Sequence, residues 1–359
     1  MSSGGNKTVR LISIVIPMRN EARRIEERME QIAAQDVAVN VEILVGDGVS
    51  DDDSVALLHE AAERLGLNVK VITNPGRAAS SGLNVCIRQA TGDLIVRMDC
   101  HARYPTDYLT SCIRASEETG ADNVGGPTLT EGQTPSERAV ACAMDSPFGG
   151  IGWSKIVGDE PVEHDTVYCG AFRPSAFEKA GLFDERFKLN EDEEFNLRLR
   201  RAGGRVVLDP RIRIWYTPRS TLRGVFSQYY GYGVSKPPLM AKHLRIASVR
   251  SLVPAVFVFS IAALGAAAVW STWARWALAV ELLVYVALAL ATAGAAVRGR
   301  RESAKLLPRV AATFPAFHLG YGLGMLRGLT GVVSSLRARR HDTRLATSLS
   351  GDSGAHPSG

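Results

Sequence analysis

Several signatures of common protein classes are missing from this sequence of 359 residues. The five cysteines are Cys86, Cys100, Cys112, Cys142 and Cys169. Their number is odd and no two are spaced as Cys-x-x-Cys, so neither a disulfide framework nor a zinc cluster is predicted. Reduced thiols in a cytosolic domain are the simplest interpretation. The apolar run Val9–Met18 is too short for a signal peptide or a membrane helix.

Glycine-rich phosphate loops are missing as well. Neither Gly-x-Gly-x-x-Gly nor Gly-x-x-x-x-Gly-Lys-Ser occurs, and the loop Gly46-Asp47-Gly48 is acidic. The net charge is +5, yet the basic residues cluster beside apolar stretches rather than among polar and aromatic residues. That distribution is typical of segments at a membrane surface, and it argues against a nucleic-acid partner.

The N-terminal part of the chain alternates between apolar strands and amphipathic helices. Strands are predicted at Leu11–Pro17, Val41–Val45, Val69–Thr73 and Leu94–Met98. Helices are predicted after Asn20, at Asp51–Leu65 and at Ser80–Ala90. This alternation indicates βαβ units and an α/β fold with a mostly parallel sheet. Ligands of such sheets bind beyond the carboxyl ends of the strands.

Polar side chains follow each of these four strands, in loops that we expect to meet in one crevice. They are Asn20 with Glu21, Asp47, Asn74 with Arg77, and Asp99 with His101. Asp47 is either a turn residue or an acceptor of hydrogen bonds from a uracil ring or a ribose. Asn20, and one of Ser50 or Asp51, are predicted to cap the helices that follow them.

Asp99 and His101 lie two residues apart after the fourth predicted strand. Side chains at this spacing on an extended segment point the same way, so both can face one divalent cation. Mg²⁺ or Mn²⁺ there would neutralise the charge on a leaving nucleoside diphosphate, and imidazole suits Mn²⁺ better. The alternative is an exposed polar turn.

The acidic run Glu191–Glu194 begins a helix predicted to end at Arg201. The helix dipole alone favours acidic residues in a first turn. The other explanation is a general base that takes the proton from an acceptor hydroxyl. One base is enough for an inverting displacement, whereas a retaining hydrolase needs two carboxylates. The Gly-, Ser- and Asp-rich stretch Asp145–Asp165 is predicted to be an active-site loop.

Long apolar runs begin only at Leu252. Leu252–Ser271 and Trp276–Val297 are each long enough to cross about 30 Å of hydrocarbon, and the short turn between them predicts a hairpin. Basic residues on both flanks predict that these flanks lie on the cytoplasmic side. A third apolar segment, 306–336, either spans the membrane or lies in its interface.

These observations predict six regions along the chain. They are a polar tail over 1–10, a catalytic domain over 11–236, a basic juxtamembrane segment over 237–251, the hairpin over 252–297 (252–271 and 276–297), the third apolar segment over 306–336, and a tail over 337–359 that is first basic and then disordered.

The motifs together resemble the family 2 glycosyltransferases of the GT-A fold. The resemblance covers Leu11–Lys236 and is carried by Ser13-Ile14-Val15-Ile16-Pro17 with Asn20-Glu21, Asp47-Gly48 with Ser50 and Asp51, Asp99-Cys100-His101, and Glu191-Asp192. A closer similarity is to the succinoglycan and exopolysaccharide glucosyltransferase subgroup. It is carried by His101-Ala102-Arg103-Tyr104-Pro105, Cys169–Arg173, Gln228–Lys236 and His318–Gly324.

The resemblance implies a Rossmann-like GT-A domain followed by transmembrane helices, and it implies roles for particular residues. Nucleotide-sugar contacts are implied at Pro17, Asn20, Glu21, Asp47, Arg77 and Asp99. A divalent cation, Mn²⁺ or Mg²⁺, is implied at Asp99 and His101, and a catalytic base at Asp192 beside Glu191. Acceptor or sugar contacts are implied at Cys169, Gly170, Gln228, Tyr229 and Tyr232, although aromatic residues there could instead anchor the membrane interface.

The chain departs from the family pattern in two places. His101 stands where the commoner motif ends in Asp. The Gln-x-x-Arg-Trp motif of processive synthases is absent, since Gln228 is followed by Gly231 and Tyr232. This argues for the addition of one sugar rather than the extrusion of a polymer.

We therefore expect an inverting transfer of a sugar, glucose from a UDP-linked donor, to a lipid-linked saccharide in exopolysaccharide or cell-surface glycan biosynthesis. The expected location is the inner (plasma) membrane, with several membrane passes and a cytoplasmic catalytic domain. One alternative is a polyprenyl-phosphate glycosyltransferase, whose acceptor needs no base. The other is an inactive membrane-bound protein that binds nucleotide sugars or acts as a scaffold.

Overall fold

The computed structural model describes residues 8–149, 158–244 and 249–351, without the side chains of 335–351. Part of the predicted loop Asp145–Asp165, residues 150–157, lies outside the described residues, as does the end of the predicted tail, 352–359. The chain divides into two compact units. The first is Met1–Thr221 with Ala289–Ala311, and the second is Leu222–Leu288 with Ala312–Gly359.

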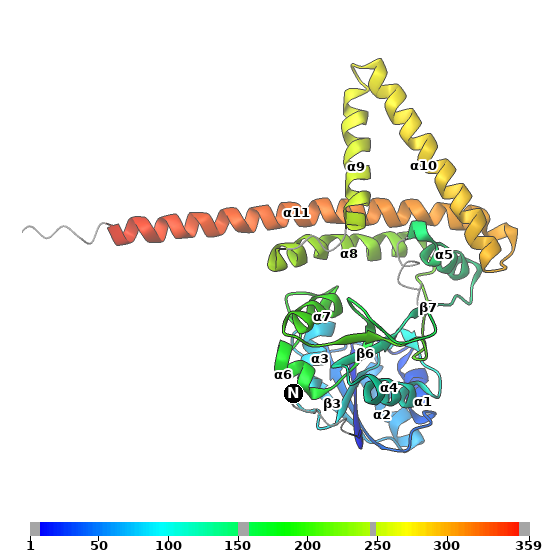
Figure 1. Cartoon of the computed structure of the whole chain (residues 1–359), viewed down its shortest axis with the longest axis vertical. Helices are drawn as coiled ribbons and strands as arrows, with labels where there is room; N and C mark the ends of the chain where they lie inside the picture. Colours follow the sequence, from blue (N-terminus) through cyan, green and yellow to red (C-terminus); the bar gives the residue numbers. More distant parts are fainter. Residues whose placement is uncertain (1–7, 150–157, 245–248, 352–359) are drawn as a thin grey trace, which may run out of the picture. The chain divides into compact units, whose positions relative to one another are not determined.

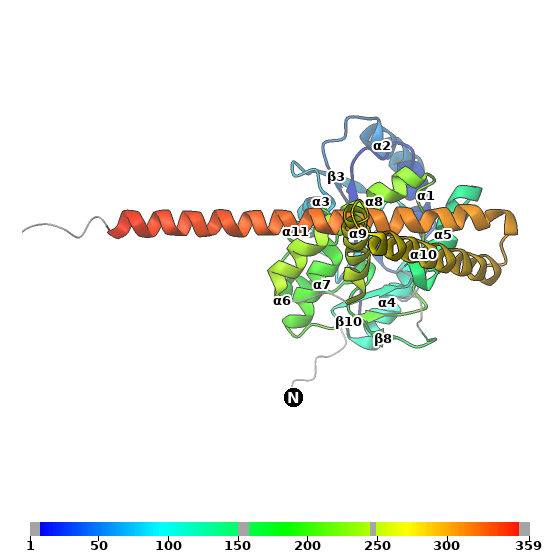
Figure 2. The same cartoon turned by 90° about the horizontal axis from the view of Figure 1, so that it is seen from above.

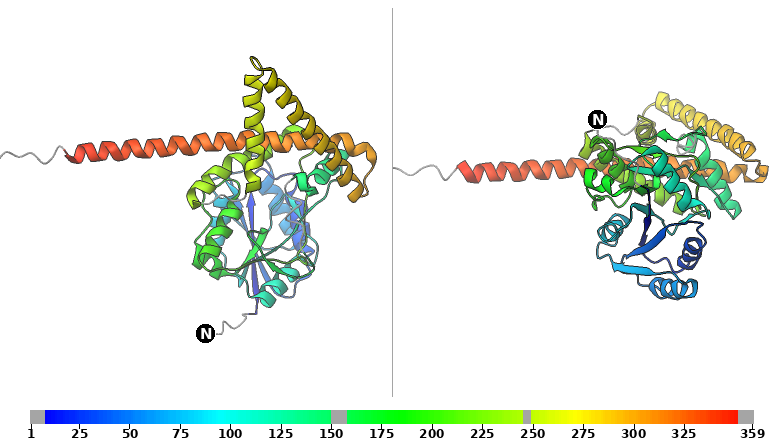
Figure 3. Two further views of the ribbon diagram at one scale, coloured as in Figure 1. Left: turned by 45° about the horizontal axis from the view of Figure 1, so that its top comes forward. Right: turned by 60° about the horizontal axis from the view of Figure 1, so that its bottom comes forward.

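An eight-stranded sheet forms the centre of the first unit, as the views in Figures 1 and 3 show. Its order is β3 (Val69–Thr73), β2 (Asn40–Asp47), β1 (Leu11–Met18), β4 (Leu94–Arg97), β9 (Tyr168–Phe172), β6 (Asn123–Gly126), β10 (Val206–Leu208) and β8 (Val162–Glu163). The first four of these are mutually parallel, whereas β9 runs antiparallel to both of its neighbours. The four predicted N-terminal strands and the mostly parallel sheet are therefore confirmed.

Both faces of this sheet are buried, as expected when helices connect parallel strands. In β1, Ile12, Ile14 and Ile16 belong to one apolar cluster and Val15 belongs to another. The helices of this unit are α1 (Ile25–Ala33), α2 (Ser54–Leu65), α3 (Ala79–Ile87), α4 (Tyr108–Thr119), α5 (Pro135–Asp145), α6 (Pro174–Ala180) and α7 (Glu191–Arg201). Short 3-10 turns are found at Pro147–Gly149 and Ala304–Leu306.

The predicted helix caps are wrong. Helix α1 begins after Arg24 and α2 after Asp53, and neither of these residues makes a capping hydrogen bond through its side chain. Asn20 instead bonds Asp51 in both directions, since its amide donates to the carboxylate (2.6 Å) and its oxygen accepts from the Asp51 backbone (3.1 Å). These residues therefore tie the loop after β1 to the loop after β2.

A second, three-stranded sheet in the first unit has the order β5 (Ala102–Arg103), β11 (Ile214–Tyr216) and β7 (Thr128–Thr130). Arg300, from the 289–311 segment of this unit, donates to the hydroxyl (2.9 Å) and the carbonyl (2.8 Å) of Thr130 and to the carboxylate of Asp145. We call these contacts the Arg300 latch. They fasten the residues after the second predicted membrane span to β7 and α5.

The second unit contains four helices or parts of them. They are α8 (Leu222–His243), α9 (Val249–Ala267), most of α10 (Thr272–Gly299) and most of α11 (Leu307–Gly351). Helices α8 and α11 lie side by side (Figures 1 and 2). Glycines on α11 allow their close approach. A Cβ added at Gly320, Gly324 or Gly328 would lie 2.7, 2.1 or 2.5 Å from the carbonyl oxygen of Phe226, Tyr230 or Val234. Each step of four residues on α11 thus matches four on α8, so the two helices run in the same direction.

Helices α9 and α10, of 19 and 28 residues, are the two in the described part of the chain that are long and apolar enough to cross a membrane. They correspond to the predicted spans Leu252–Ser271 and Trp276–Val297. Large apolar side chains on them are exposed, including Val253, Phe259 and Leu283. Apart from Leu306, the third apolar segment, 306–336, lies within α11, which does not meet the same condition over its described residues.

Candidate active site

The carboxyl ends of β1, β2, β3 and β4 meet at one edge of the large sheet, as predicted. The backbone of Gly48 donates to Met18 (2.7 Å) and that of Asn74 donates to Asp47 (2.7 Å). The backbone of Met98 donates to Val15 (3.1 Å). The loops that carry the predicted nucleotide contacts are thus joined by backbone hydrogen bonds.

Helix α3 lies unusually close to this edge. A Cβ on Gly46 would lie 2.4 Å from the Gly82 carbonyl oxygen, and a Cβ on Gly82 would lie 3.3 Å from the side chain of Pro17. A side chain at Gly46 would clash with the helix backbone, and one at Gly82 would make tight contacts, so the two glycines allow this close approach. Pro17 therefore lies where β1, β2 and the N-terminal half of α3 converge.

Asp47 and Arg77 have different surroundings at this edge. Asp47 accepts hydrogen bonds from the Ser50 hydroxyl (2.6 Å) and the Ser50 backbone. It therefore orders the β2–α2 loop, and the half-buried carboxylate also remains partly open to a ligand. Arg77 is exposed in a turn after β3, with a left-handed backbone (φ 55°).

The centre of the site is an ion cluster around Arg97, the last residue of β4. Its side chain is 4% exposed. Nε and Nη2 bind the two oxygens of Asp99 at 2.7 and 2.8 Å, while Nη1 binds Asp192 at 2.7 Å and Glu191 at 3.0 Å. Asp99 and Asp192, 93 positions apart, are thus brought together by one guanidinium, and we call these four residues the Arg97 cluster.

Burial and charge shift the pKa values of Asp192 and Asp99 in opposite directions. Burial raises the pKa of Asp192, and the Arg97 guanidinium lowers it. The negative charges of Glu191 and Asp99 raise it further, so that the pKa of Asp192 reaches about 7. Burial also raises the pKa of Asp99, but the Arg97 guanidinium outweighs this, so that the pKa of Asp99 lies below its ordinary value. Asp192 is therefore the carboxylate of the two that can accept a proton near neutral pH.

His101 and Glu21 lie together beside the cluster. His101 Nε2 is 3.0 Å from Glu21 Oε1, and the His101 side chain is 41% exposed. The other oxygen of Glu21 is buried and accepts no hydrogen bond, although it lies 3.5 Å from a nitrogen of Arg24. Among the described residues, no three His, Cys, Asp or Glu side chains converge as a preformed metal site.

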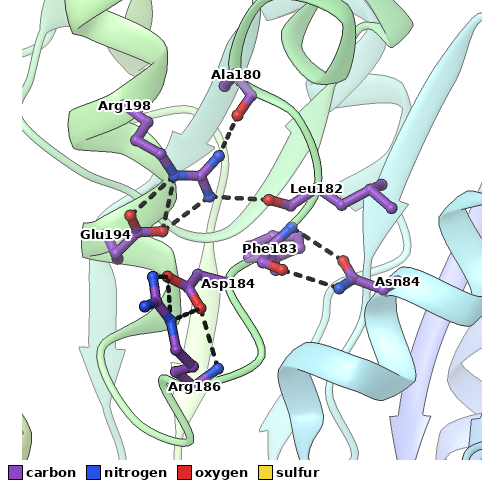
Figure 4. A network of polar contacts seen from close by, with 8 residues as sticks. All are labelled: Asn84, Ala180, Leu182, Phe183, Asp184, Arg186, Glu194 and Arg198. Carbon is purple, nitrogen blue, oxygen red and sulfur yellow. Dashed lines mark hydrogen bonds and ion pairs between the residues drawn. The ribbon is translucent and has the colours of Figure 1, made fainter. Parts of the chain in front are cut away.

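The helix that carries Asp192 is held by contacts one turn further along (Figure 4). Glu194, fully buried, pairs with Arg198 at 2.8 Å, and Arg198 also donates to the carbonyls of Ala180 and Leu182. Asn84 of α3 exchanges two hydrogen bonds of 2.9 Å with the backbone of Phe183. The segment before α7 is thereby fixed to both α7 and α3.

Two predicted sugar contacts have a different setting from the one expected. The Cys169 side chain is fully buried, where its sulfur accepts a hydrogen bond from Tyr104 (3.4 Å). A Cβ on Gly170 would lie 2.3 Å from the side-chain oxygen of Asn123. The Cys169 thiol is thus enclosed, whereas contacts of a sugar with the backbone of Cys169 or Gly170 stay a prediction. Gln228, Tyr229 and Tyr232 lie on α8 in the second unit, where Gln228 donates to Tyr232 (3.2 Å).

Comparisons with known proteins agree with this fold. The family model for glycosyl transferase family 2 matches residues 13–180. The chain is 31% identical to the succinoglycan biosynthesis protein ExoA of Rhizobium meliloti over 88% of this chain and 94% of that protein.

Two further proteins are similar to the chain. The first is a protein of Methanococcus voltae, dolichyl N-acetyl-alpha-D-glucosaminyl phosphate 3-beta-D-2,3-diacetamido-2,3-dideoxy-beta-D-glucuronosyltransferase. It is 29% identical over 64% of this chain and 74% of that protein. Among solved structures, the mannosyltransferase PcManGT of Pyrobaculum calidifontis, in complex with GDP-Man and Mn²⁺, shares the fold with a TM-score of 0.61 at 20% identity. The match covers 89% of this chain and 88% of that one.

Proposed function

The chain belongs to glycosyltransferase family 2 and is a glycosyltransferase of GT-A fold that acts in polysaccharide or lipid-linked sugar transfer. From this premise we propose that it transfers one glucose, with inversion, from UDP-glucose to a lipid-linked saccharide at the inner membrane. The single observation that carries the proposal is the Arg97 cluster. It sets a carboxylate of raised pKa, Asp192, beside Asp99 at the edge of the sheet where the predicted donor contacts lie.

In the proposed mechanism, the donor's uracil and ribose lie against the loops of Pro17, Glu21, Asp47 and Asp99. Asp192 accepts the proton of the acceptor hydroxyl as its oxygen attacks the anomeric carbon, and the bond from that carbon to the diphosphate breaks. Arg97 lies against the Asp192 carboxylate and stabilises its ionised form before the proton arrives. One attack on one face inverts the anomeric configuration.

The residues present fit a divalent cation shared with the donor. Asp99 and His101 offer one carboxylate and one imidazole, and such cations usually complete their coordination with substrate phosphates and water rather than with a full protein cage. A buried carboxylate oxygen of Glu21 accepts no hydrogen bond and lies beside His101, so it could serve as a further ligand of the cation. When bound, the cation would neutralise the leaving diphosphate.

A lipid-linked acceptor is supported by two features. The similar protein of Methanococcus voltae is named for a dolichyl-linked sugar phosphate. Helices α9 and α10 are apolar and outwardly exposed, and Trp270, Trp273 and Trp276 near their turn are 83, 73 and 70% exposed, as expected of an aromatic belt. We propose that these helices cross the inner membrane as a hairpin and that the catalytic unit is cytoplasmic.

The test is a donor screen with the purified full-length chain in lipid nanodiscs and Mn²⁺, with released nucleoside diphosphate and labelled lipid product as the two readouts. We expect product with UDP-glucose and a lipid-linked saccharide, and a new linkage of inverted configuration by NMR. Product formed only with a bare polyprenyl phosphate would support the rival acceptor. Nucleotide binding with no turnover of any donor would support an inactive binding protein.

A further inference from the structure

Arg97 was not among the residues expected at the site, because it lies within the predicted strand Leu94–Met98, ahead of the loop where the polar site residues were expected. Its side chain is instead almost completely buried and contacts three carboxylates. Burying a guanidinium is costly unless its hydrogen-bonding groups are paired. The pairing here connects residues on both sides of the proposed reaction.

We propose that Arg97 is a positioning residue that joins the donor side of the site to the acceptor side. It holds Asp99 with Nε and Nη2 and holds Asp192 with Nη1, so that both carboxylates are fixed by one rigid group. This inference rests on the proposed function, because it takes Asp99 as a donor residue and Asp192 as the base.

The geometry calls for arginine rather than for any cation. A guanidinium is planar and has donors on two edges, so it can grip one carboxylate with two hydrogen bonds and still reach another. Arg97 does this at 2.7 and 2.8 Å to Asp99 and at 2.7 Å to Asp192. A lysine ammonium is a single point of charge and cannot hold the two carboxylates in the same relative position.

The charge of the cluster supports the same role. One guanidinium faces Asp99, Glu191 and Asp192, so the cluster carries excess negative charge when all three are ionised. A nucleoside diphosphate would add more negative charge beside it. Loss of Arg97 should therefore weaken donor binding through Asp99 and slow transfer through Asp192.

The chain offers a matched control in Arg211. Its Nε and Nη2 hold the two oxygens of buried Asp209 at 2.9 and 2.7 Å, in the same two-bond arrangement. Arg211 also pairs with Glu118 and contacts none of the cluster residues in these pairings. The Arg211 side chain is 33% exposed, against 4% for Arg97, so Arg211→Lys reports the cost of exchanging a guanidinium that holds a buried aspartate from a more open position.

The experiment compares Arg97→Lys and Arg211→Lys in the full-length chain in nanodiscs, by UDP affinity with Mn²⁺ and by kcat for transfer. We expect Arg97→Lys to lower both by about 10- to 100-fold, the usual effect of losing a group that orients a ligand-binding side chain. Arg211→Lys should change each by less than about threefold. Equal, small effects of both variants, with unchanged thermal unfolding, would overturn the inference.

A second comparison separates positioning from a merely structural role. If Arg97 acts on kcat through Asp192, its replacement should matter little once Asp192 is gone. The kcat of the double variant Arg97→Lys with Asp192→Asn should then be less than about threefold below that of Asp192→Asn alone. Losses that multiply would show that the two residues act independently and would overturn the proposal.

Two further outcomes are also informative. If Arg97→Lys does not fold, Arg97→Met with Asp192→Asn removes one charge of each sign. UDP affinity about tenfold below that of Asp192→Asn alone is then expected, because Asp99 is no longer held. Equal affinity would overturn the proposal. Should the wild-type chain transfer no sugar, the proposed function fails, while the UDP comparison still tests the link between Arg97 and Asp99.

Discussion

The active site of the first unit and the α8–α11 helix pair of the second unit are held together by different kinds of contact. At the site of the first unit, loops and a helix distant in sequence are joined by charged side chains, with Arg97 binding Asp99, Glu191 and Asp192. In the second unit, α8 and α11 contact each other at glycines of α11 that are four residues apart and have no side chain to separate the two helices. Charged contacts fix the direction of reacting groups, whereas small residues fix the distance between helices without any polar group.

The largest effect that this comparison predicts is on catalysis. Asp192→Asn should keep the shape of the cluster but remove the proton acceptor, so kcat should fall by at least about 100-fold while UDP affinity stays within a few-fold. Kinetics with a sugar acceptor, together with UDP calorimetry, measure the two quantities. If Asp192→Asn kept most of the activity of the wild type, Asp192 would not be the base, and a lipid phosphate acceptor would be favoured.

The next effect should appear in the second unit. Gly324→Ala places a Cβ 2.1 Å from the Tyr230 carbonyl and should destabilise the α8–α11 pair by about 1–3 kcal/mol. Gly331, seven residues further along α11, has open space around it, so Gly331→Ala should be neutral or stabilise by about 0.5–1 kcal/mol. Unfolding in mixed micelles measures the change in the free energy of unfolding for each variant. An equal destabilisation by Gly324→Ala and Gly331→Ala would contradict the close packing.

A smaller effect is expected from pH. The base must be ionised to act, and burial raises the pKa of Asp192 to about 7, so lowering the pH from 7 to 6 should reduce the rate several-fold. The loss follows protonation of Asp192, so the residual activity of Asp192→Asn should not show this step. A wild-type rate that is flat from pH 8 to pH 5.5 would show that the carboxylate stays ionised during turnover.

The smallest effect concerns a polar contact between α9 and α10, the two helices that we propose cross the membrane. Ser260 of α9 donates to Glu281 of α10 at 2.5 Å. Hydrogen bonds between membrane helices contribute about 0.6 kcal/mol on average, so Ser260→Ala should destabilise the protein by about that amount in the same mixed-micelle unfolding. A loss as large as that of Gly324→Ala would mean that the second unit also depends on polar contacts.

Much of the first unit follows from local patterns in the sequence. Runs such as Leu11–Met18 are β-branched and are buried on both faces of the sheet, so they identify strands without further context. Asp99 could be found because it follows a predicted strand, and the run Glu191–Glu194 because it begins a predicted helix. The choice of Asp192 within that run came from the resemblance to the family. The location of Asp99 at the sheet edge follows from the topology of a parallel sheet.

What the sequence did not reveal depends on contacts between distant residues. Arg97 could not be assigned, because its partners Glu191 and Asp192 lie more than 90 positions away and converge only in the fold. Helix α8 includes Pro237 and Pro238 and several glycines, residues that disfavour helices in isolation. Its regular structure depends on packing against α11. Asn20 has the residue type of a helix cap, yet the side chain is used by Asp51.

The Arg300 latch has a practical consequence for the biochemistry of this enzyme. Residues 289–311 include the end of the predicted hairpin, 289–297, but belong to the catalytic unit, where Arg300 binds Thr130 and Asp145. Ala293, Val297 and Leu306 of the same segment are buried. A truncation ahead of α9, the obvious way to obtain a soluble enzyme, would remove this support from α5 and β7. Replacing 249–288 with a short polar linker would keep it.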